Sequence, residues 1–327
     1  ISAFSKLKRP INRTPLFEAI KKSVNDRLIG DVDVGCFLSG GFDSSLIAYI
    51  ASKKLNKKLK TFSIGFNEED YDESKNALLI SKFINSDHNQ YFLGVSELLK
   101  YIPEISKASD QPFADSSFLP MLALCNLSSK SVKVCLSGDG ADEMFAGYER
   151  YRRAILLQKL KPLNFITLKI ILLINLFISK SKVLKNYQDR LIKVKSLLLT
   201  ENSGALYDEI SCLGIGLDIS KGLFIETIKK EKKKDKNFDF LNNCLLHDLT
   251  HYLPEDLLIK SDRASMRYSL EVRNPFLNQE ILKVAFNYPS SYLTDFRIGK
   301  KPLREISNNI FPKNMILKKK KGFAVPL

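Results

Sequence analysis

The sequence predicts an α/β fold, in which a parallel sheet with helices on both faces is followed by a mainly helical region. Over the first 150 residues, short apolar runs alternate with helix-like runs, the pattern of a helix-covered parallel sheet. After residue 150 we identify no strand pattern. Residues 1–150 hold 19 Lys and Arg against 19 Asp and Glu, so the whole excess of +15 lies in residues 151–327. This asymmetry predicts a domain boundary near residue 150.

The elements of the first half follow from the apolar pattern. A linker over residues 1–14 precedes a helix predicted over Pro15–Leu28. Four apolar runs predict short, mostly buried strands over Asp33–Leu38, Lys60–Phe66, His88–Leu93 and Val132–Leu136. The intervening helices are predicted over Ser44–Lys54, Glu73–Phe83, Val95–Ser106 and Phe118–Ser128. In sheets of this kind, ligands bind beyond the carboxyl ends of the strands.

The second half is predicted to be helical, with breaks at Pro162, Gly204, Gly214, Gly222 and Pro254. Its basic excess favours a solvated helical face, with a surface for nucleic acid or anionic lipid as the alternative. The run Lys229–Lys236 fits an exposed helix face or a loop. Phe165–Lys182 is apolar but too short for a membrane span, so a buried helix is favoured over an interfacial one.

Cysteine usage indicates a reducing compartment, and we expect a cytoplasmic protein. The five cysteines are scattered and none forms a C-x-x-C pair, so neither a disulfide framework nor a zinc site is indicated. His247 and His251 are four residues apart, but without an H-E-x-x-H glutamate they favour packing or surface positions. The chain begins at Ile1 without a signal-peptide pattern, and we expect it to be a fragment.

A polar turn joins the first predicted strand to its helix, in the segment Ser39-Gly40-Gly41-Phe42-Asp43-Ser44-Ser45. Glycines let the backbone approach a ligand closely, and the first N–H groups of the helix attract an anion. An aspartate beside a phosphate is explained if Mg²⁺ lies between them, because Mg²⁺ is held by carboxylates and phosphate oxygens. The alternative is a plain strand–helix turn with Asp43 near the N-cap. The spacing is neither a Walker A loop nor G-x-G-x-x-G.

A second turn repeats this arrangement after the fourth predicted strand, in Leu136-Ser137-Gly138-Asp139-Gly140-Ala141-Asp142-Glu143. Asp139 and Asp142 are three residues apart, so both can face one side of a first helical turn. The alternative is that these acids cap the helix and complement its dipole. Together with Asp43 at a neighbouring strand end, they favour a shared Mg²⁺–pyrophosphate site.

Five segments carry a resemblance to a known family. The first loop resembles the S-G-G-x-D-S pyrophosphate loop of ATP pyrophosphatases, which cleave ATP between the α and β phosphates. Five motifs in order resemble the synthetase domain of glutamine-hydrolysing asparagine synthetases: VGCFLSGGFDSS, QPFADSSFLP, LSGDGADEMFAGYERY, YLPEDLLIKSDRASMRYSLEVRNPFL and KKGF. The resemblance covers most of residues 15–327 and is weakest over about 155–245.

The resemblance implies ATP and Mg²⁺ as cofactors and assigns the residues that hold them. Leu38 and Ile64 match positions that flank the adenosine. Asp43 and Asp142 match the Mg²⁺ ligands. The remaining ATP-contacting positions match Ser39, Gly40, Gly41, Ser44, Ser45, Ser137 and Gly138.

The resemblance also implies residues that serve the reaction. Lys320, or its neighbour Lys321, matches a catalytic lysine in a K-x-G-F pattern. Asp139 matches an acid near the aspartate and the ammonia, where family members have Asp or Glu. Other positions that line the synthetase cleft match Lys260, Asp262, Arg263 and Arg273.

The implied reaction is the ATP-dependent amidation of L-aspartate to L-asparagine through β-aspartyl-AMP. In this family, ammonia comes from glutamine in a preceding glutaminase domain. Residues 1–327 match only the synthetase domain, so we expect this chain to use free ammonia. Relatives amidate other acids, such as sugar acids of surface polysaccharides, and a tRNA-modifying ATP pyrophosphatase or a non-enzymatic scaffold are further alternatives. Nucleic acid and a transmembrane segment are not expected, and the oligomeric state is open, a homodimer included.

Overall fold

One parallel sheet of five strands organises the molecule. The computed structural model describes residues 14–66, 72–160, 207, 210, 239–295, 297–312 and 315. The strands are β1 (Val34–Phe37), β2 (Lys60–Phe66), β3 (Asp87–Leu93), β4 (Val134–Leu136) and β5 (Glu271–Arg273). They lie in the order β3-β2-β1-β4-β5, and every neighbouring pair is parallel. The predicted fold class is confirmed.

The helices of the first half match their predicted positions closely. They are α1 (Thr14–Arg27), α2 (Phe42–Lys54), α3 (Ser74–Phe83) and α6 (Phe118–Ser129). Two further helices, whose bounds were not predicted, are α7 (Ala141–Met144) and α8 (Glu149–Leu160). The predicted helix over Val95–Ser106 divides instead into α4 (Val95–Leu99) and α5 (Ile102–Ala108). Pro103 lies at the start of α5, where its missing N–H costs nothing, so it begins a new helix there.

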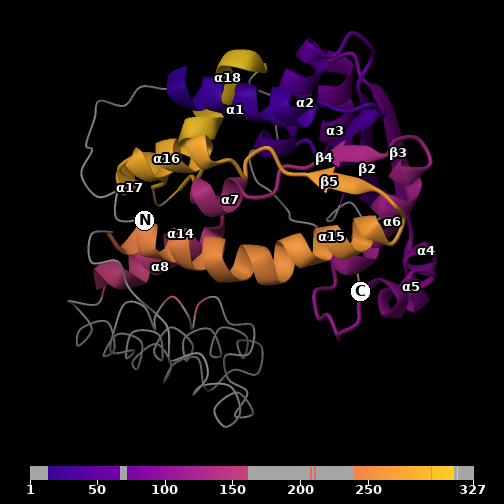
Figure 1. Cartoon of the computed structure of the whole chain (residues 1–327). Helices are drawn as coiled ribbons and strands as arrows, with labels where there is room; N and C mark the ends of the chain where they lie inside the picture. The colour runs from indigo at the N-terminus through magenta and orange to yellow at the C-terminus, as the bar shows by residue number, and fades with distance from the viewer. Residues whose placement is uncertain are drawn as a thin grey trace.

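The second half contains one long helical run, coloured orange in Figure 1. It is formed by α14 (Phe240–His247), a π-helix η4 (Asp248–Leu258) and α15 (Ile259–Met266), which follow one another without interruption. The predicted break at Pro254 is wrong, because Pro254 lies inside η4. Proline lacks the backbone N–H that helix bonding uses, and here the chain forms a π-helix over Asp248–Leu258 instead of ending the helical run. The remaining helices are α16 (Gln279–Asn287), α17 (Ser290–Leu293) and α18 (Lys301–Ile310).

The second half also supplies β5, which corrects the expectation of no strand after residue 150. β5 pairs with β4, with Leu136 opposite Arg273. Three residues are too few to show an alternating pattern, which explains why the sequence did not reveal this strand. Its pairing means that residues far apart in the chain complete one sheet. The predicted division near residue 150 stays a prediction.

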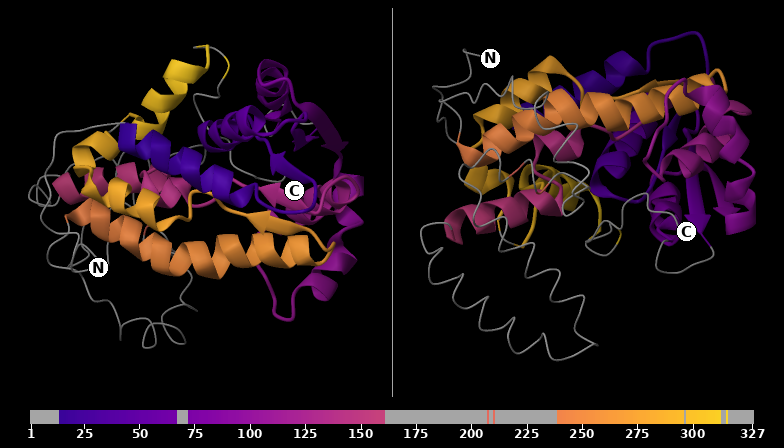
Figure 2. Two further views of the ribbon diagram at one scale, coloured as in Figure 1. Left: turned by 45° about the horizontal axis from the view of Figure 1, so that its top comes forward. Right: turned by 90° about the horizontal axis from the view of Figure 1, so that it is seen from below.

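Two hydrophobic clusters cover the two faces of the sheet. Successive residues of β1 point to opposite faces, so Cys36 belongs to one cluster and Phe37 to the other. The first cluster includes side chains from α1, α2, α16 and α18, and α1 lies beside α16 (Figure 2). The second includes side chains from α6 and α15. The sheet is therefore held between helices, and its carboxyl edge stays free for a site.

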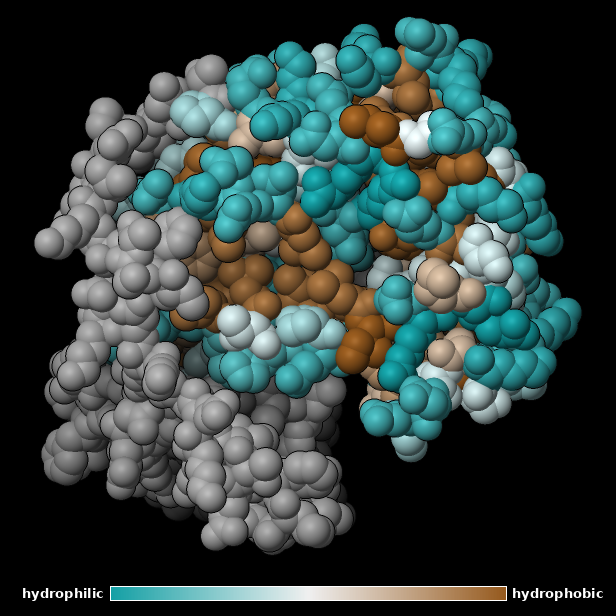
Figure 3. All heavy atoms as spheres, viewed as in Figure 1, coloured by the Kyte–Doolittle hydropathy of each residue, from teal (hydrophilic) through white to brown (hydrophobic). Residues whose placement is uncertain are grey.

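The surface is mixed in character. On the face drawn in Figure 3, hydrophobic side chains gather in the middle and at the upper right, and hydrophilic ones lie above and to the right of the central group. Within the described part of the chain, no helix has the length and apolar character needed to cross a membrane. The segments Phe165–Lys182 and Lys229–Lys236 lie outside the described residues.

Candidate functional site

A cavity of about 860 Å³ lies at the carboxyl ends of β1, β2 and β4. Phe37, Phe62 and Met121 give one part of its wall an apolar character, while serines and acids line another part. This is the edge at which parallel sheets bind ligands. Eleven residues predicted from the sequence line it: Leu38, Ser39, Gly41, Asp43, Ser44, Ile64, Ser137, Gly138, Asp139, Asp142 and Lys260.

The loop after β1 presents the start of α2 to the cavity. Gly41 is the N-cap of α2, and no side chain caps this helix. Two contacts join Ser39 to the first turn of α2. The backbone N–H of Ser39 donates to Ser44 Oγ at 3.2 Å, and the hydroxyl oxygens of Ser39 and Ser44 lie 3.0 Å apart. Gly40 has φ of 78°, and a Cβ there would lie 2.7 Å from the backbone nitrogen of Ala77. Uncapped N–H groups at a helix start form a ready site for an anion.

The loop after β4 packs directly on the first loop. The backbone N–H of Ser137 donates to the carbonyl of Arg273 at 2.9 Å, so β5 holds this loop in place. Ser137 Oγ donates to Asp139 Oδ2 at 2.9 Å. A Cβ on Gly138 would lie 3.1 Å from the Cβ of Asp43, a contact tight enough to push the loops apart. The glycine therefore lets two strand ends share one site.

A lysine from the end of the chain lies between the acids of the two loops. Lys300 Nζ is 2.5 Å from Asp43 Oδ2 and 2.7 Å from Asp142 Oδ1. All three side chains are buried, with exposed fractions of 8%, 12% and 9%. At Gly147, a Cβ would lie 1.9 Å from Asp142 Oδ1 and 2.1 Å from Lys300 Cε. Only glycine fits there, so the close packing around this ion-pair cluster depends on it.

The two aspartates fit a Mg²⁺ ion that is also bound by phosphate. Asp43 Oδ1 is buried and has no hydrogen-bond partner, so it can serve as a ligand. Among the described residues, no group of three or more His, Cys, Asp and Glu side chains could hold a metal. Because Mg²⁺ commonly takes one or two carboxylates and completes its shell with water and phosphate, two aspartates suffice. Lys300 already shows that this position is favourable for a cation.

Glu143, the residue after Asp142, is a second acid at this cavity with a buried oxygen that has no hydrogen-bond partner. Its side chain is fully buried, Oε1 accepts from the Tyr148 hydroxyl at 2.5 Å, and Oε2 has no partner. Burial, together with the negative charge of Asp142, raises the pKa of Glu143 to about 7. Both Glu143 and Tyr148 line the cavity.

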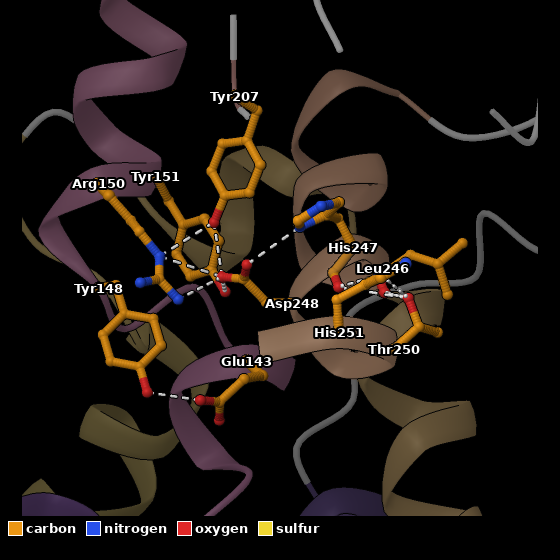
Figure 4. Close-up of polar contacts among 10 residues, drawn as sticks. All are labelled: Glu143, Tyr148, Arg150, Tyr151, Tyr207, Leu246, His247, Asp248, Thr250 and His251. Atoms are coloured by element: carbon orange, nitrogen blue, oxygen red, sulfur yellow. Dashed lines mark hydrogen bonds and ion pairs between the residues drawn. The ribbon is translucent and has the colours of Figure 1, made fainter. Parts of the chain in front are cut away.

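Behind Tyr148 lies a buried network centred on Asp248 (Figure 4). Asp248 Oδ2 accepts from Arg150 Nη2 at 2.8 Å, from the Tyr151 hydroxyl at 2.5 Å and from the Tyr207 hydroxyl at 2.6 Å. Burial alone would raise the pKa of Asp248, but His247, Arg150 and the tyrosines lower it below its ordinary value. This carboxylate therefore stays ionised and satisfied.

The Asp248 network supports the cavity wall through Arg150. The guanidinium carbon of Arg150 is 4.3 Å from the ring centre of Tyr148 and 4.2 Å from that of Tyr252. Both tyrosines line the cavity, and cations favour the faces of aromatic rings. His247 and His251 lie beside this network with their ring centres 4.8 Å apart, so they pack against each other.

A third charged group lines the cavity from α15. Lys260 Nζ donates to Asp115 Oδ2 at 2.5 Å and to Ser117 Oγ at 2.8 Å. Burial would raise the pKa of Asp115, but the charge and hydrogen bond of Lys260, with the Ser117 N–H, lower it. Arg263, three residues further on, binds Ser109 and does not line the cavity.

Comparison with known proteins places this fold and site in a family. The family model described as asparagine synthase matches residues 16–327. The chain belongs to the asparagine synthase family. The predicted resemblance is thus confirmed, because the model covers nearly the whole chain.

Two curated relatives of this family align along most of the chain. It is 30% identical over 327 residues to asparagine synthetase (glutamine-hydrolyzing) 1 of Bacillus subtilis, covering 95% of this chain and 49% of the relative. A protein named putative asparagine synthetase (glutamine-hydrolyzing) of Mycobacterium bovis is 31% identical over 321 residues, and the alignment covers 94% of this chain and 47% of the relative. The chain thus spans about half the length of these relatives. A solved NH3-dependent NAD synthetase from Campylobacter jejuni is similar with a TM-score of 0.32 and 16% identity, covering 42% of this chain and 61% of that chain.

Among the described residues of this asparagine synthase family member, five that were predicted at the site or in the cleft do not line the cavity: Gly40, Ser45, Asp262, Arg263 and Arg273. Gly40 serves the turn, and Ser45 is fully buried beneath it. Arg273 was expected in the cleft, but Nη1 donates to the carbonyl oxygens of Arg27 and Ile29, both at 2.9 Å. Its side chain therefore joins α1 to β5, and only its backbone supports the site. Lys320 lies outside the described residues.

Several lining residues were missed by the sequence analysis. Lys300 and Arg304 lie on or beside α18, and Arg304 covers the Phe42 ring at 4.4 Å. The available signal was Pro302, which favours a helix start and says nothing of contact with the acids. Other missed lining residues are Gly147, Tyr148, Arg152 and Tyr252.

Proposed function

We propose that this chain catalyses the ATP-dependent amidation of L-aspartate to L-asparagine, with release of AMP and pyrophosphate. The observation that carries the proposal is the Lys300 ammonium held between Asp43 and Asp142, where two polar loops meet at the carboxyl edge of the sheet. Membership of the asparagine synthase family supports it. The reaction class is that of a ligase forming a carbon–nitrogen bond.

The loop after β1 binds the pyrophosphate part of ATP in this proposal. The uncapped start of α2 and the Ser39 and Ser44 hydroxyls supply donors for phosphate oxygens. The apolar wall near Leu38 and Ile64 receives the adenosine. Mg²⁺, held by Asp43 and Asp142, would supply positive charge to the leaving pyrophosphate when bound.

Adenylation is the first chemical step. The β-carboxylate of aspartate attacks the α-phosphorus of ATP, the bond to pyrophosphate breaks, and β-aspartyl-AMP forms. Lys300 and Arg304 line the cavity as cations, and they offset negative charge that develops on the phosphoryl oxygens. The position of Lys300 between Asp43 and Asp142 supports it as the catalytic lysine in this proposal, and a contribution of Lys320 stays a prediction.

Amide formation is the second step. Ammonia attacks the activated carbonyl carbon, the bond to AMP breaks, and a proton leaves the new amide nitrogen. Asp139, which lines the cavity, is proposed to accept that proton. The relatives are named as glutamine-hydrolyzing enzymes, so we propose glutamine as the nitrogen source in the longer protein, and free ammonia for this chain.

Pyrophosphate release from ATP–Mg²⁺ with ammonium chloride tests the proposal. Release should require L-aspartate and should disappear in Asp43→Asn. Asp33→Asn is a matched control, because Asp33 lies at the amino end of β1, where its carboxylate pairs with Lys60 at 3.3 Å. Release that depends on another carboxylic acid would overturn the substrate and keep the adenylation. A folded protein that binds no ATP and releases no pyrophosphate would overturn the reaction.

A further inference from the structure

The ammonium group of Lys300 contacts the same carboxylates that would hold a metal ion. Its Nζ lies 2.5 Å from Asp43 Oδ2 and 2.7 Å from Asp142 Oδ1. A Mg²⁺ ion bound by both aspartates needs these oxygens or the space beside them. We propose that Lys300 and Mg²⁺ exclude each other from this position, and that Lys300 leaves it only when a phosphate group binds beside it. The inference rests on the proposed function only in taking Asp43 and Asp142 as the Mg²⁺ ligands.

Packing and charge both prevent the two cations from sharing the cluster. All three side chains are buried, and a Cβ on Gly147 would collide with Asp142 Oδ1 and Lys300 Cε, so the cluster has no free space on that side. Asp43 Oδ1 has no hydrogen-bond partner, but a metal ion on that oxygen would still lie beside the ammonium on Oδ2. Repulsion between two cations is weakly screened in a buried site. Mg²⁺ by itself balances the charge of two carboxylates, so the ammonium then needs another partner.

The backbone of Lys300 is held on both sides, so the side chain is the part that can move. Lys300 has φ of 56°, its N–H donates to the Phe145 carbonyl at 3.0 Å, and its carbonyl accepts from the Arg304 N–H at 2.9 Å. Its flexible four-carbon stem can carry the ammonium to a new partner while these bonds persist. The ammonium already touches Asp43, in the first turn of α2. A phosphate bound at the uncapped start of α2 is therefore a nearby acceptor.

This exchange couples metal binding to phosphate binding. When no phosphate is bound, moving Lys300 away from the aspartates leaves a buried ammonium without a partner, which is costly. When phosphate is bound, the ammonium has a new partner and the aspartates are available to the metal ion. Each ligand therefore favours the binding of the other, and such a coupling is reciprocal. Lys300 thus acts as a positioning residue that prevents free divalent ions from binding without a phosphate.

Binding of Mn²⁺ without nucleotide tests the exclusion directly, because Mn²⁺ takes similar oxygen ligands and is detected by electron paramagnetic resonance. Lys300→Met should bind Mn²⁺ at least about 10-fold more tightly than wild type, although the same variant is expected to lose pyrophosphate release. Arg304→Met is the matched control, since Arg304 is a cation that lines the same cavity and donates from Nε to the Gly299 carbonyl at 2.7 Å. Its Mn²⁺ affinity should stay within about threefold of wild type, because Lys300 remains between the aspartates.

Equal Mn²⁺ affinity in wild type and Lys300→Met would overturn the exclusion. An equal gain in Arg304→Met would also overturn it, since a general effect of charge would then explain the result. A crystal structure of the wild type with Mn²⁺ and pyrophosphate is a second test that needs no variant. Lys300 Nζ should then contact a phosphate oxygen, and an ammonium that keeps both carboxylates beside the bound metal ion would overturn the proposal. Neither test involves turnover, so the expected Mn²⁺ result in a protein that releases no pyrophosphate would support the exclusion and overturn only the proposed reaction.

Discussion

Two buried acid clusters differ in how completely the protein satisfies them. Asp248 is surrounded by Arg150, Tyr151 and Tyr207, which all bond one oxygen, and His247 lies 3.5 Å from the other (Figure 4). The cluster at the sheet edge is incomplete. Among the described residues, the only carboxylates with a buried oxygen that lacks a partner are Asp43 and Glu143, and both line the cavity.

The difference distinguishes a structural cluster from a binding one. A complete network stabilises the fold and gains nothing from a ligand. In an incomplete network, a buried oxygen without a partner keeps its desolvation cost. A bound cation or hydrogen-bond donor removes this cost, so such a network favours ligand binding. The two clusters are joined by Arg150, whose guanidinium contacts the tyrosine rings of the cavity wall. The predictions below change one cluster at a time.

The largest effect is expected for Lys300→Met, which removes the cation from the incomplete cluster. Pyrophosphate release should fall by about 10²–10³-fold, because a charge that stabilises the phosphoryl transition state is lost. Lys301→Met is the matched control, since Lys301 pairs with Asp295 at 2.9 Å and does not line the cavity. Similar losses in both variants would show that the location of Lys300 between the acids has no bearing on the rate.

Asp248→Asn breaks the complete cluster. It should lower the free energy of unfolding by about 3 kcal/mol, since Arg150 is left as a buried charge without its partner. Urea unfolding measures the loss. Asp239→Asn is the control, because Asp239 caps α14 and asparagine caps equally well.

The same comparison depends on pH. Because folding lowers the pKa of Asp248, its stabilisation is complete above the ordinary aspartate pKa of about 4 and is lost as the pH falls through the folded value. The difference in free energy of unfolding between wild type and Asp248→Asn should therefore be smaller at pH 3 than at pH 7. A gap that is constant with pH would contradict an ionised Asp248.

Glu143→Gln tests the cost of the incomplete cluster. Since burial raises the pKa of Glu143 to about 7, the folded protein keeps this proton longer, and wild-type stability should fall as the pH rises from about 4 to 7. Glu143→Gln should remove this decrease in the free energy of unfolding, because glutamine does not ionise. Its amide oxygen can still accept the hydrogen bond from the Tyr148 hydroxyl. Glu104→Gln is the control and should not increase the free energy of unfolding at pH 7, because Lys107 first and Arg267 next lower the pKa of Glu104. If the free energy of unfolding changed with pH in the same way in wild type and in Glu143→Gln, the ionisation of Glu143 would not be the cause.

The smallest effect is expected for Arg273→Met. The side chain donates to two backbone carbonyl groups at the end of α1 and to Glu271 at 2.7 Å, so unfolding should become easier by about 1–2 kcal/mol. The turnover number should change by less than about twofold, because only the backbone of Arg273 supports the Ser137 loop. A large fall in turnover at unchanged stability would restore the catalytic role that the sequence suggested.

The sequence revealed the parts of the site that are local in the chain. Both loops follow a strand and start a helix, so glycine, serine and aspartate at fixed spacing marked them, and β2 was predicted to the residue. Lys300 contacts Asp43 across 257 positions, and no local pattern encodes such a contact. β5 was not predicted because three residues are too few to show a strand pattern. The motif around Arg273 correctly indicated a segment next to the site, but it did not show that the Arg273 side chain points away from the cavity, toward the end of α1.

The parallel pairing of β5 with β4 sets an order of assembly. More than 130 residues separate the two strands, and loop closure of that length makes their pairing a late event in folding. During synthesis, the first four strands can form while the Ser137 loop still lacks the carbonyl of Arg273 that holds it. Lys300 arrives later still. The nascent chain therefore carries Asp43 and Asp142 without the Lys300 ammonium until all five strands of the sheet have been made, and the ion-pair cluster is completed only after the sheet.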